Sequence, residues 1–224
     1  MKPLMIDLFA GLGGWCDGGL VEGYEVVGFD IERHDYGDGM RYPAQLVLQD
    51  VMTMVGSQFK DAALIVASPP CQAYSYRAMP WKRAKALPPP SNELFDACFR
   101  IQREAIEAAG RFIPMVVENV RGAQPWVGRS RCNYGSFYLR GDVPALMPIA
   151  KGALKAGVCH RADGATNFHG HKQKGSGAAW FDNGLCKHGS KSNSRKAASA
   201  LIAKIPLPLS QHIARYWYPR EAVA

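Results

Sequence analysis

The sequence lacks several features that would place the protein outside the ordinary globular class. It has no uninterrupted run of about 18 apolar residues, the length that a transmembrane helix requires. Its first residues enter a strand-like pattern directly and do not resemble a signal peptide. It also has no internal repeat and no long low-complexity tract. We therefore expect a cytoplasmic protein that does not bind a membrane.

The sequence lacks a regular framework of cysteines. In a cytoplasmic chain of this size, cysteines of this kind are thiols, a catalytic nucleophile or metal ligands more often than disulfides. The six cysteines follow no regular spacing: Cys16, Cys71, Cys98, Cys132, Cys159 and Cys186.

Acidic residues are in the minority. The 224 residues include 27 Lys and Arg but 19 Asp and Glu, so the net charge is +8. A basic protein of this kind favours a polyanionic partner, because each phosphate that it neutralises releases condensed counterions. Simple solubility is the alternative explanation, and charge alone does not separate the two. The length fits one compact domain with its own core.

Short apolar runs alternate with helical patterns along most of the chain. This alternation predicts an α/β fold with a doubly wound, mostly parallel sheet that is covered on both faces. The predicted strands are residues 4–9, 25–31, 46–51, 63–68, 114–120 and 134–139. The predicted helices are residues 15–22, 92–110 with Ser91 as N-cap, 197–204 and 209–218.

The composition of the sequence divides the chain into three parts. Residues 1–141 form the predicted catalytic and cofactor-binding α/β core. Residues 142–196 are rich in Gly, Ser, Lys and His and predict a small irregular basic insertion. Residues 197–224 predict a C-terminal helix that returns to the core.

The first candidate site is a glycine-rich turn. The first predicted strand ends in Asp-Leu-Phe-Ala-Gly-Leu-Gly-Gly, residues 7–14. Clustered glycines let the backbone approach a ligand closely. Asp30 ends the next predicted strand, and an acidic residue at that position is what recognition of a nucleotide ribose requires. With Asp50 after the third strand, the pattern favours a bound adenosine over a tight turn without a ligand.

The second candidate site combines a thiol with a carboxylate. Cys71 follows the strand at 63–68 within Ser-Pro-Pro-Cys-Gln, and the flanking prolines restrict its backbone. Glu118 ends the next apolar strand, where a carboxylate is costly to bury unless it is paired or catalytic. Both residues are predicted at the carboxyl ends of strands, where open α/β sheets bind ligands. An inert buried thiol and a turn-capping carboxylate are the alternatives.

These motifs together resemble those of cytosine-C5 DNA methyltransferases. DLFAGLGG, GFDIE, QDV, PPCQAYS and ENV occur in the order of that family, over roughly residues 4–122. The resemblance, to a short, phage-like member, implies a Rossmann-like S-adenosylmethionine-dependent methyltransferase fold. It implies that Cys71 adds to C6 of a flipped-out cytosine in double-stranded DNA, with Glu118 at N3 and the exocyclic amine. It places S-adenosylmethionine among ten residues: Phe9, Ala10, Gly11, Gly13, Gly14, Asp30, Ile31, Asp50, Val51 and Pro69.

The sequence also departs from the family. The usual Gln-x-Arg-x-Arg segment is represented by Gly-Arg-Ser-Arg, residues 128–131, so Arg131 is the third catalytic candidate. The target-recognition region is reduced to about 55 residues, 142–196, in which Lys and Arg outnumber Asp and Glu. Such a segment suits phosphate contact better than base reading. The spacings of Cys159, His160, His169, His171, Cys186 and His188 do not favour zinc, and we expect no metal.

The residues leave several alternatives open. The protein could be a non-catalytic DNA-binding relative, or it could need a partner chain for target recognition. The same chemistry could act on RNA or a free nucleotide, or could transfer an altered methyl group. We expect a monomer that acts on double-stranded DNA.

Overall fold

The computed structural model describes residues 1–74, 88–148, 157–160, 166–169 and 192–219. Its centre is a seven-stranded sheet with the order β3-β2-β1-β4-β5-β7-β6. The first five of these strands pair in parallel. Strand β7 pairs antiparallel with β5, and β6 pairs antiparallel with β7. The sheet is therefore mostly parallel, as the sequence predicted. The strands are β1 (Leu4–Leu8), β2 (Glu25–Asp30), β3 (Gln45–Leu48), β4 (Ala62–Ala67), β5 (Met115–Asn119), β6 (Cys132–Tyr134) and β7 (Phe137–Gly141).

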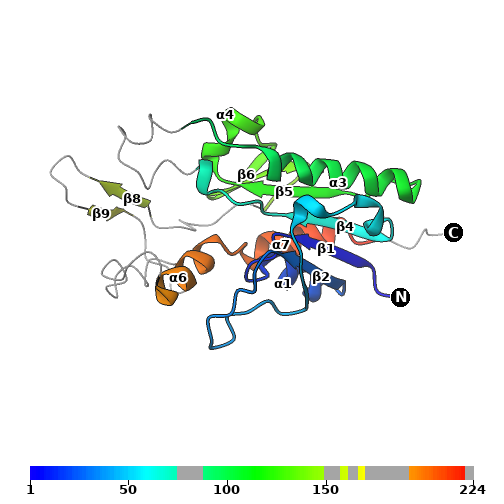
Figure 1. Ribbon diagram of the computed structural model, residues 1–224, viewed down its shortest axis with the longest axis horizontal. Helices are drawn as coiled ribbons and strands as arrows, with labels where there is room; N and C mark the ends of the chain where they lie inside the picture. Colours follow the sequence, from blue (N-terminus) through cyan, green and yellow to red (C-terminus); the bar gives the residue numbers. More distant parts are fainter. Residues whose placement is uncertain (75–87, 149–156, 161–165, 170–191, 220–224) are drawn as a thin grey trace.

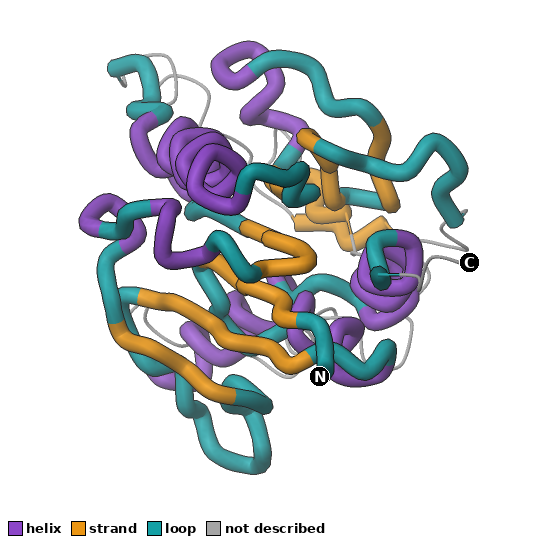
Figure 2. Tube along the Cα trace, turned by 90° about the vertical axis from the view of Figure 1, so that its right-hand side faces the viewer, coloured by secondary structure: helices purple, strands orange, loops and turns teal. Residues whose placement is uncertain are grey.

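Helices cover both faces of this sheet. Helix α3 (Glu93–Ala109) lies along one face, and α1 (Gly14–Val21) and α7 (Leu207–Tyr216) lie on the other (Figure 1). The view turned by 90° shows the strands between these helices (Figure 2). The doubly wound arrangement predicted from the sequence is therefore confirmed.

The central strands are apolar on both faces, which explains why they are continuous apolar runs. Met5 and Leu64 pack toward α1 and α7, and their neighbours Ile6 and Ile65 pack toward α3. All four side chains are at most 2% exposed. Burying each contributes about 1.5–3 kcal/mol, so an alternating polar pattern would not stabilise this sheet.

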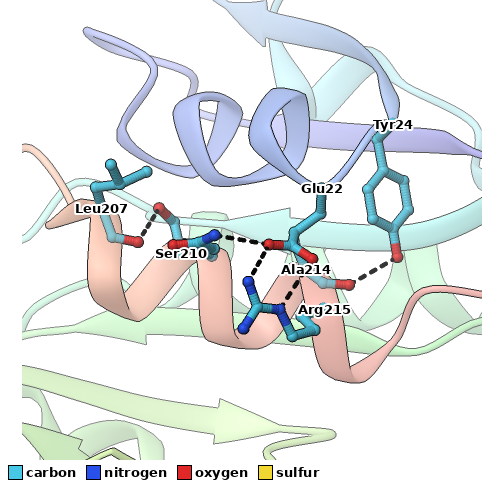
Figure 3. Close-up of polar contacts among 7 residues, drawn as sticks. Glu22, Tyr24, Leu207, Ser210, Ala214 and Arg215 are labelled. Carbon is cyan, nitrogen blue, oxygen red and sulfur yellow. Dashed lines mark hydrogen bonds and ion pairs between the residues drawn. The ribbon is translucent and has the colours of Figure 1, made fainter.

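Hydrogen bonds connect the C-terminal helix α7 to the turn that follows α1 (Figure 3). The guanidinium of Arg215 and the amide of Gln211 both donate to the carboxylate of Glu22, at 2.8 Å. The hydroxyl of Tyr24 donates to the carbonyl of Ala214 at 3.1 Å. Helix α7 thus covers the helix that follows the glycine turn.

Three sequence predictions differ from the structure in detail. Residues 134–139 were predicted as one strand but belong to two, β6 and β7, because Gly135 adopts a φ of 60° and lets the chain reverse. Helix α3 begins at Glu93 after Asn92, although the Glu93 N–H still bonds the Ser91 hydroxyl at 3.3 Å. Helix α6 (Asn193–Ala203) begins four residues earlier than predicted.

The remaining elements are short. Strands β8 (Gly157–His160) and β9 (Thr166–His169) form a separate antiparallel pair. Helix α4 (Gln124–Val127) follows β5. Within the described ranges, the helices are all too short or too polar to cross a membrane.

Candidate active site

The candidate residues gather at one edge of the sheet. Strand β1 pairs with β2 on one side and β4 on the other, so the order of the strands reverses between β1 and β4. Doubly wound sheets bind ligands outside the carboxyl ends of their strands at such a switch point. The glycine turn follows β1 and the Pro-Pro-Cys loop follows β4, so both predicted motifs border it.

The turn after β1 has an unusual backbone. Phe9 and Gly11 have φ angles of 61° and 51°, in the left-handed region. For a phenylalanine this conformation is strained, and such strain gathers at functional sites. The Ala10 N–H donates to the Phe29 carbonyl at 3.0 Å, and the Gly11 N–H donates to Asp30 Oδ2 at 2.9 Å. These two bonds tie the turn to the end of β2.

Asp30 is held as a buried carboxylate. Its side chain accepts from the Gly11 N–H and, through Oδ1, from the Glu32 N–H at 3.2 Å. His34 Nε2 lies 3.7 Å from Oδ1. Burial by itself would raise the pKa of Asp30, but the bonds from His34, Gly11 and Glu32 outweigh it and lower the pKa below its usual value. Asp30 is therefore negatively charged at neutral pH, with its position fixed.

The three glycines of the turn differ in their surroundings. A Cβ on Gly13 would collide with Pro43, and one on Gly14 would collide with the backbone of Ile205. A Cβ on Gly11 would meet no described atom closer than 3.9 Å. Gly13 and Gly14 thus have a packing requirement of their own, whereas a Cβ on Gly11 would meet only the Phe9 carbonyl, at an ordinary van der Waals distance. Cofactor contact by Gly13 and Gly14 stays a prediction.

The other predicted cofactor residues lie at the ends of β2, β3 and β4. Ile31 is 73% exposed, an apolar side chain directly beside the carboxylate of β2. Asp50 begins the turn after β3, where its Oδ1 accepts from the Met52 N–H at 2.9 Å. Val51 and Pro69 are buried. The switch-point edge therefore offers acidic acceptors and an exposed apolar surface side by side in the fold.

A buried hydrogen bond joins the loop of Cys71 to the strand of Glu118. The side-chain amide of Asn119, 1% exposed, donates to the carbonyl of Pro69 at 3.0 Å. Asn119 directly follows Glu118, and Pro69 lies two residues before Cys71. Glu118 is 8% exposed and Cys71 is half-buried. The structure therefore brings the two predicted catalytic residues to adjacent strand ends.

Two arginines of the segment after β5, the predicted Arg131 and Arg140 of β7, differ in burial. Arg131 is exposed, and its backbone N–H donates to the carbonyl of Leu139 at 2.9 Å. Arg140 on β7 is 5% exposed and donates through Nε and Nη2 to the carbonyl of Gly128. Burial lowers the pKa of Arg140, and the charge of Glu118 opposes that shift. Among the described residues, Arg140 is thus the buried arginine that interacts electrostatically with Glu118, whereas Arg131 stays a predicted participant.

Sequence reasoning missed Asn119 and Arg140. Both could have been noticed in the sequence, because burying a polar side chain in an apolar strand costs free energy unless the side chain has a hydrogen-bond partner. The stretch Phe-Tyr-Leu-Arg in β7 and the asparagine that ends β5 both fit this rule. Their partners, Gly128 and Pro69, could not be read from the sequence.

Several predictions fall outside the described side chains. Except for Lys196, which is exposed in α6, the lysines of residues 142–196 lie outside the described residues, as do His171, Cys186 and His188. Cys159, His160 and His169 are described in backbone alone. In the part that is described with side chains, no three His, Cys, Asp or Glu residues are grouped so as to hold a metal ion.

Comparisons with known proteins bear on the fold. No protein-family model matches the chain, and no curated protein matches it. The structure of the Dnmt2 methyltransferase of S. pombe matches with a TM-score of 0.50 at 12% identity, over 96% of this chain and 98% of that one. The match establishes a methyltransferase-type, Rossmann-like fold, as the sequence predicted.

Two further solved structures match over shorter spans. One is a DNA modification methyltransferase encoded within a prophage, from E. coli, at 20% identity and a TM-score of 0.37 over 57% of this chain. The other is a mutant DNMT2 of Spodoptera frugiperda, at 16% identity and a TM-score of 0.36 over 56% of this chain. The matched parts span 35% and 38% of those two proteins.

Proposed function

We propose that the protein is a DNA (cytosine-5-)-methyltransferase that uses S-adenosylmethionine. The observation that carries the proposal is the buried bond between Asn119 and Pro69, which sets the loop of Cys71 beside the strand end of Glu118. A thiol and a carboxyl group at the switch point of the sheet, next to a nucleoside-type turn, suit addition to a pyrimidine ring.

The turn after β1 fits the nucleoside of S-adenosylmethionine. The Asp30 carboxylate is charged, partly used by Gly11 and Glu32, and able to accept further bonds from ribose hydroxyls. Gly11 has no close neighbour that would keep a ligand from its backbone, and Ile31 offers apolar surface to the adenine ring. These three features are what an adenosine needs from a protein: acceptors, close approach and an apolar wall.

We expect Asp30→Asn to weaken binding of S-adenosylmethionine about 10- to 100-fold, since a charged hydrogen bond contributes about 1.5–3 kcal/mol. Isothermal titration calorimetry with the folded variant measures this directly. Asp35→Asn is the matched control, because Asp35 also accepts a backbone N–H two residues on, at 3.1 Å, but is exposed. Wild-type affinity in a folded Asp30→Asn variant would place the cofactor elsewhere.

The chemistry follows from the residues at the two strand ends. The thiolate of Cys71 forms a bond to C6 of the cytosine, and the C5–C6 π electrons become available at C5. Glu118 donates a proton to N3 and accepts from the exocyclic amine, which stabilises the resulting enamine. S-adenosylmethionine, when bound, supplies an electrophilic methyl group to C5. The C5 proton then passes to solvent, and its bonding electrons restore the C5–C6 double bond as Cys71 leaves with the electrons of its C–S bond. The N3 proton returns to Glu118.

The charge of the protein supports DNA as the substrate. The net charge is +8, and Arg121, Arg129 and Arg131 are all exposed in the stretch that follows the carboxyl end of β5. These side chains lie beyond the strand that bears Glu118, where the phosphates that flank an extruded base would pass. Arginines in such a place position a nucleic acid without reading its sequence.

A direct assay tests the proposal. The protein is incubated with S-adenosylmethionine carrying a labelled methyl group and, separately, with duplex DNA, RNA and free dCMP. We expect label in duplex DNA alone, recovered by nucleoside mass spectrometry as 5-methylcytosine. Label in RNA or dCMP would redirect the substrate, and label on a nitrogen atom of the bases would exclude the Cys71 mechanism.

A further inference from the structure

Tyr74 has contacts that a buried aromatic ring does not need. It ends the short 3₁₀ turn η3 (Gln72–Tyr74), and its N–H donates to the carbonyl of Cys71 at 3.0 Å. Its side chain is 3% exposed, and its hydroxyl donates to Asn92 Oδ1 at 2.8 Å, with the Ser91 carbonyl at 3.2 Å. The turn that carries Cys71 is therefore fixed at its far end by one hydroxyl group.

The contact continues on both sides of Tyr74. The side-chain amide of Asn92 donates to the carbonyl of Trp126 at 3.0 Å, so the network reaches α4 beyond the strand of Glu118. A Cβ on Gly122 would collide with the carbonyl of Tyr74, so the two backbones touch there. Tyr74 thus links the loop after β4, the start of α3 and the segment after β5.

The hydroxyl is suited to remain a donor. Burial, together with the negative charge of Asp96, raises the pKa of Tyr74 above its usual value, although Arg140 opposes the shift. The hydroxyl therefore keeps its proton throughout the neutral range. A phenylalanine would fill the same space in the core but would make neither hydrogen bond.

We propose that Tyr74 is a positioning residue that sets the direction of the Cys71 thiol relative to Glu118. The inference rests on the proposed methyltransferase function. The bond from Asn119 to Pro69 holds the loop before Cys71, and the Tyr74 hydroxyl holds the turn after it, so both anchors set how Cys71 lies on the sheet. Nucleophilic attack needs the reacting atoms to approach along a narrow path, and a displacement of about 1 Å costs up to about 100-fold in rate.

The test compares Tyr74→Phe with a matched control. In both variants a buried tyrosine loses its hydroxyl, but in Tyr24→Phe the lost bond, to Ala214, joins the residue before β2 to α7. Each protein is mixed with S-adenosylmethionine and a duplex whose cytosines are replaced by 5-fluorocytosine. Fluorine cannot leave C5 as a proton does, so the bond from Cys71 to C6 persists and can be counted on a denaturing gel.

We expect Tyr74→Phe to slow covalent trapping and kcat about 10- to 100-fold, with the KM for DNA and the affinity for S-adenosylmethionine unchanged within about two-fold. Tyr24→Phe should trap at the wild-type rate while losing a similar amount of thermal stability. Asn92→Ala should slow trapping as Tyr74→Phe does, and the double variant should be no slower, because both changes break one network.

The outcomes separate the inference from the function on which it rests. If Tyr74→Phe traps the duplex at the wild-type rate, the positioning role is overturned and the proposed function is not. Equal slowing in Tyr24→Phe would show that lost stability is the cause and would also overturn it. A wild-type protein that binds S-adenosylmethionine but never traps the fluorinated duplex would overturn the proposed function.

Discussion

Replacing Cys71 with serine is expected to lower methyl transfer by at least about a thousand-fold. A cysteine thiol has a pKa of about 8.5 and supplies some thiolate at neutral pH, whereas a serine hydroxyl supplies almost no alkoxide. Serine is close to cysteine in size and Cys71 is half-buried, so the fold and the cofactor site should persist. Single-turnover label transfer to DNA measures the loss, and calorimetry checks that S-adenosylmethionine still binds.

Cys132→Ser provides the matched control for this experiment. Cys132 is likewise half-buried but lies on the edge strand β6, away from the switch point. Its replacement should leave methyl transfer near the wild-type rate. Substantial transfer by Cys71→Ser would remove this thiol from the mechanism, and equal losses in both variants would point to a general loss of structure.

Gly18→Ala is expected to destabilise the protein by about 2–4 kcal/mol. At this position α1 and α7 touch, and a Cβ would collide with the backbone of Ser210 and Gln211, beside the contacts of Figure 3. Alanine would gain about 1 kcal/mol in helix propensity. Overpacking usually costs about 1–3 kcal/mol and costs more where the contact is backbone, which cannot rotate away, so we expect a cost of about 3–5 kcal/mol here. Thermal unfolding should show a fall in Tm of roughly 5–15 °C.

The neighbouring glycine tests the cause of this loss. A Cβ on Gly19 would meet Met5 Sδ at 2.6 Å and Val26 Cγ2 at 3.0 Å, both of which belong to side chains that can shift. Gly19→Ala makes the same chemical change in the same helix and should cost clearly less than Gly18→Ala. Equal costs would mean that backbone contact between α1 and α7 is not the decisive factor, and a stable Gly18→Ala variant would show that the helices lie further apart.

Strands that are buried on both faces were predicted closely. Residues 4–9 and 114–120 were predicted, and the structure has Leu4–Leu8 and Met115–Asn119. Such strands are continuous apolar runs bounded by glycine, proline or charge, so composition alone marks their ends. The reversal at Gly135 was missed because residues 132–139 have the composition of one strand, and a single glycine gives a weak local signal.

The candidate site was predictable to the extent that it depends on strand ends. Parallel strands bring their carboxyl ends to one edge of the sheet. Because Asp30, Cys71 and Glu118 each end or follow a predicted strand, the sequence by itself predicted that they lie near one another. The partners that hold them were not predictable: the Gly11 N–H for Asp30, and the bond from Asn119 to Pro69 for the Cys71 loop. These contacts join residues 19 and 50 positions apart.

By itself, the sequence determined the fold class, the positions of the buried strands and the residue types available for chemistry. These properties depend on local composition and on which side chains avoid water. The tertiary structure decided the rest: that Gly13 and Gly14 are required for packing, that Arg140 and not Arg131 is the buried arginine, and that Tyr74 anchors the turn after Cys71. Such assignments depend on which segments, distant in the sequence, contact one another in the fold. Local sequence patterns do not predict these contacts, because many different pairings of segments bury the same apolar surface.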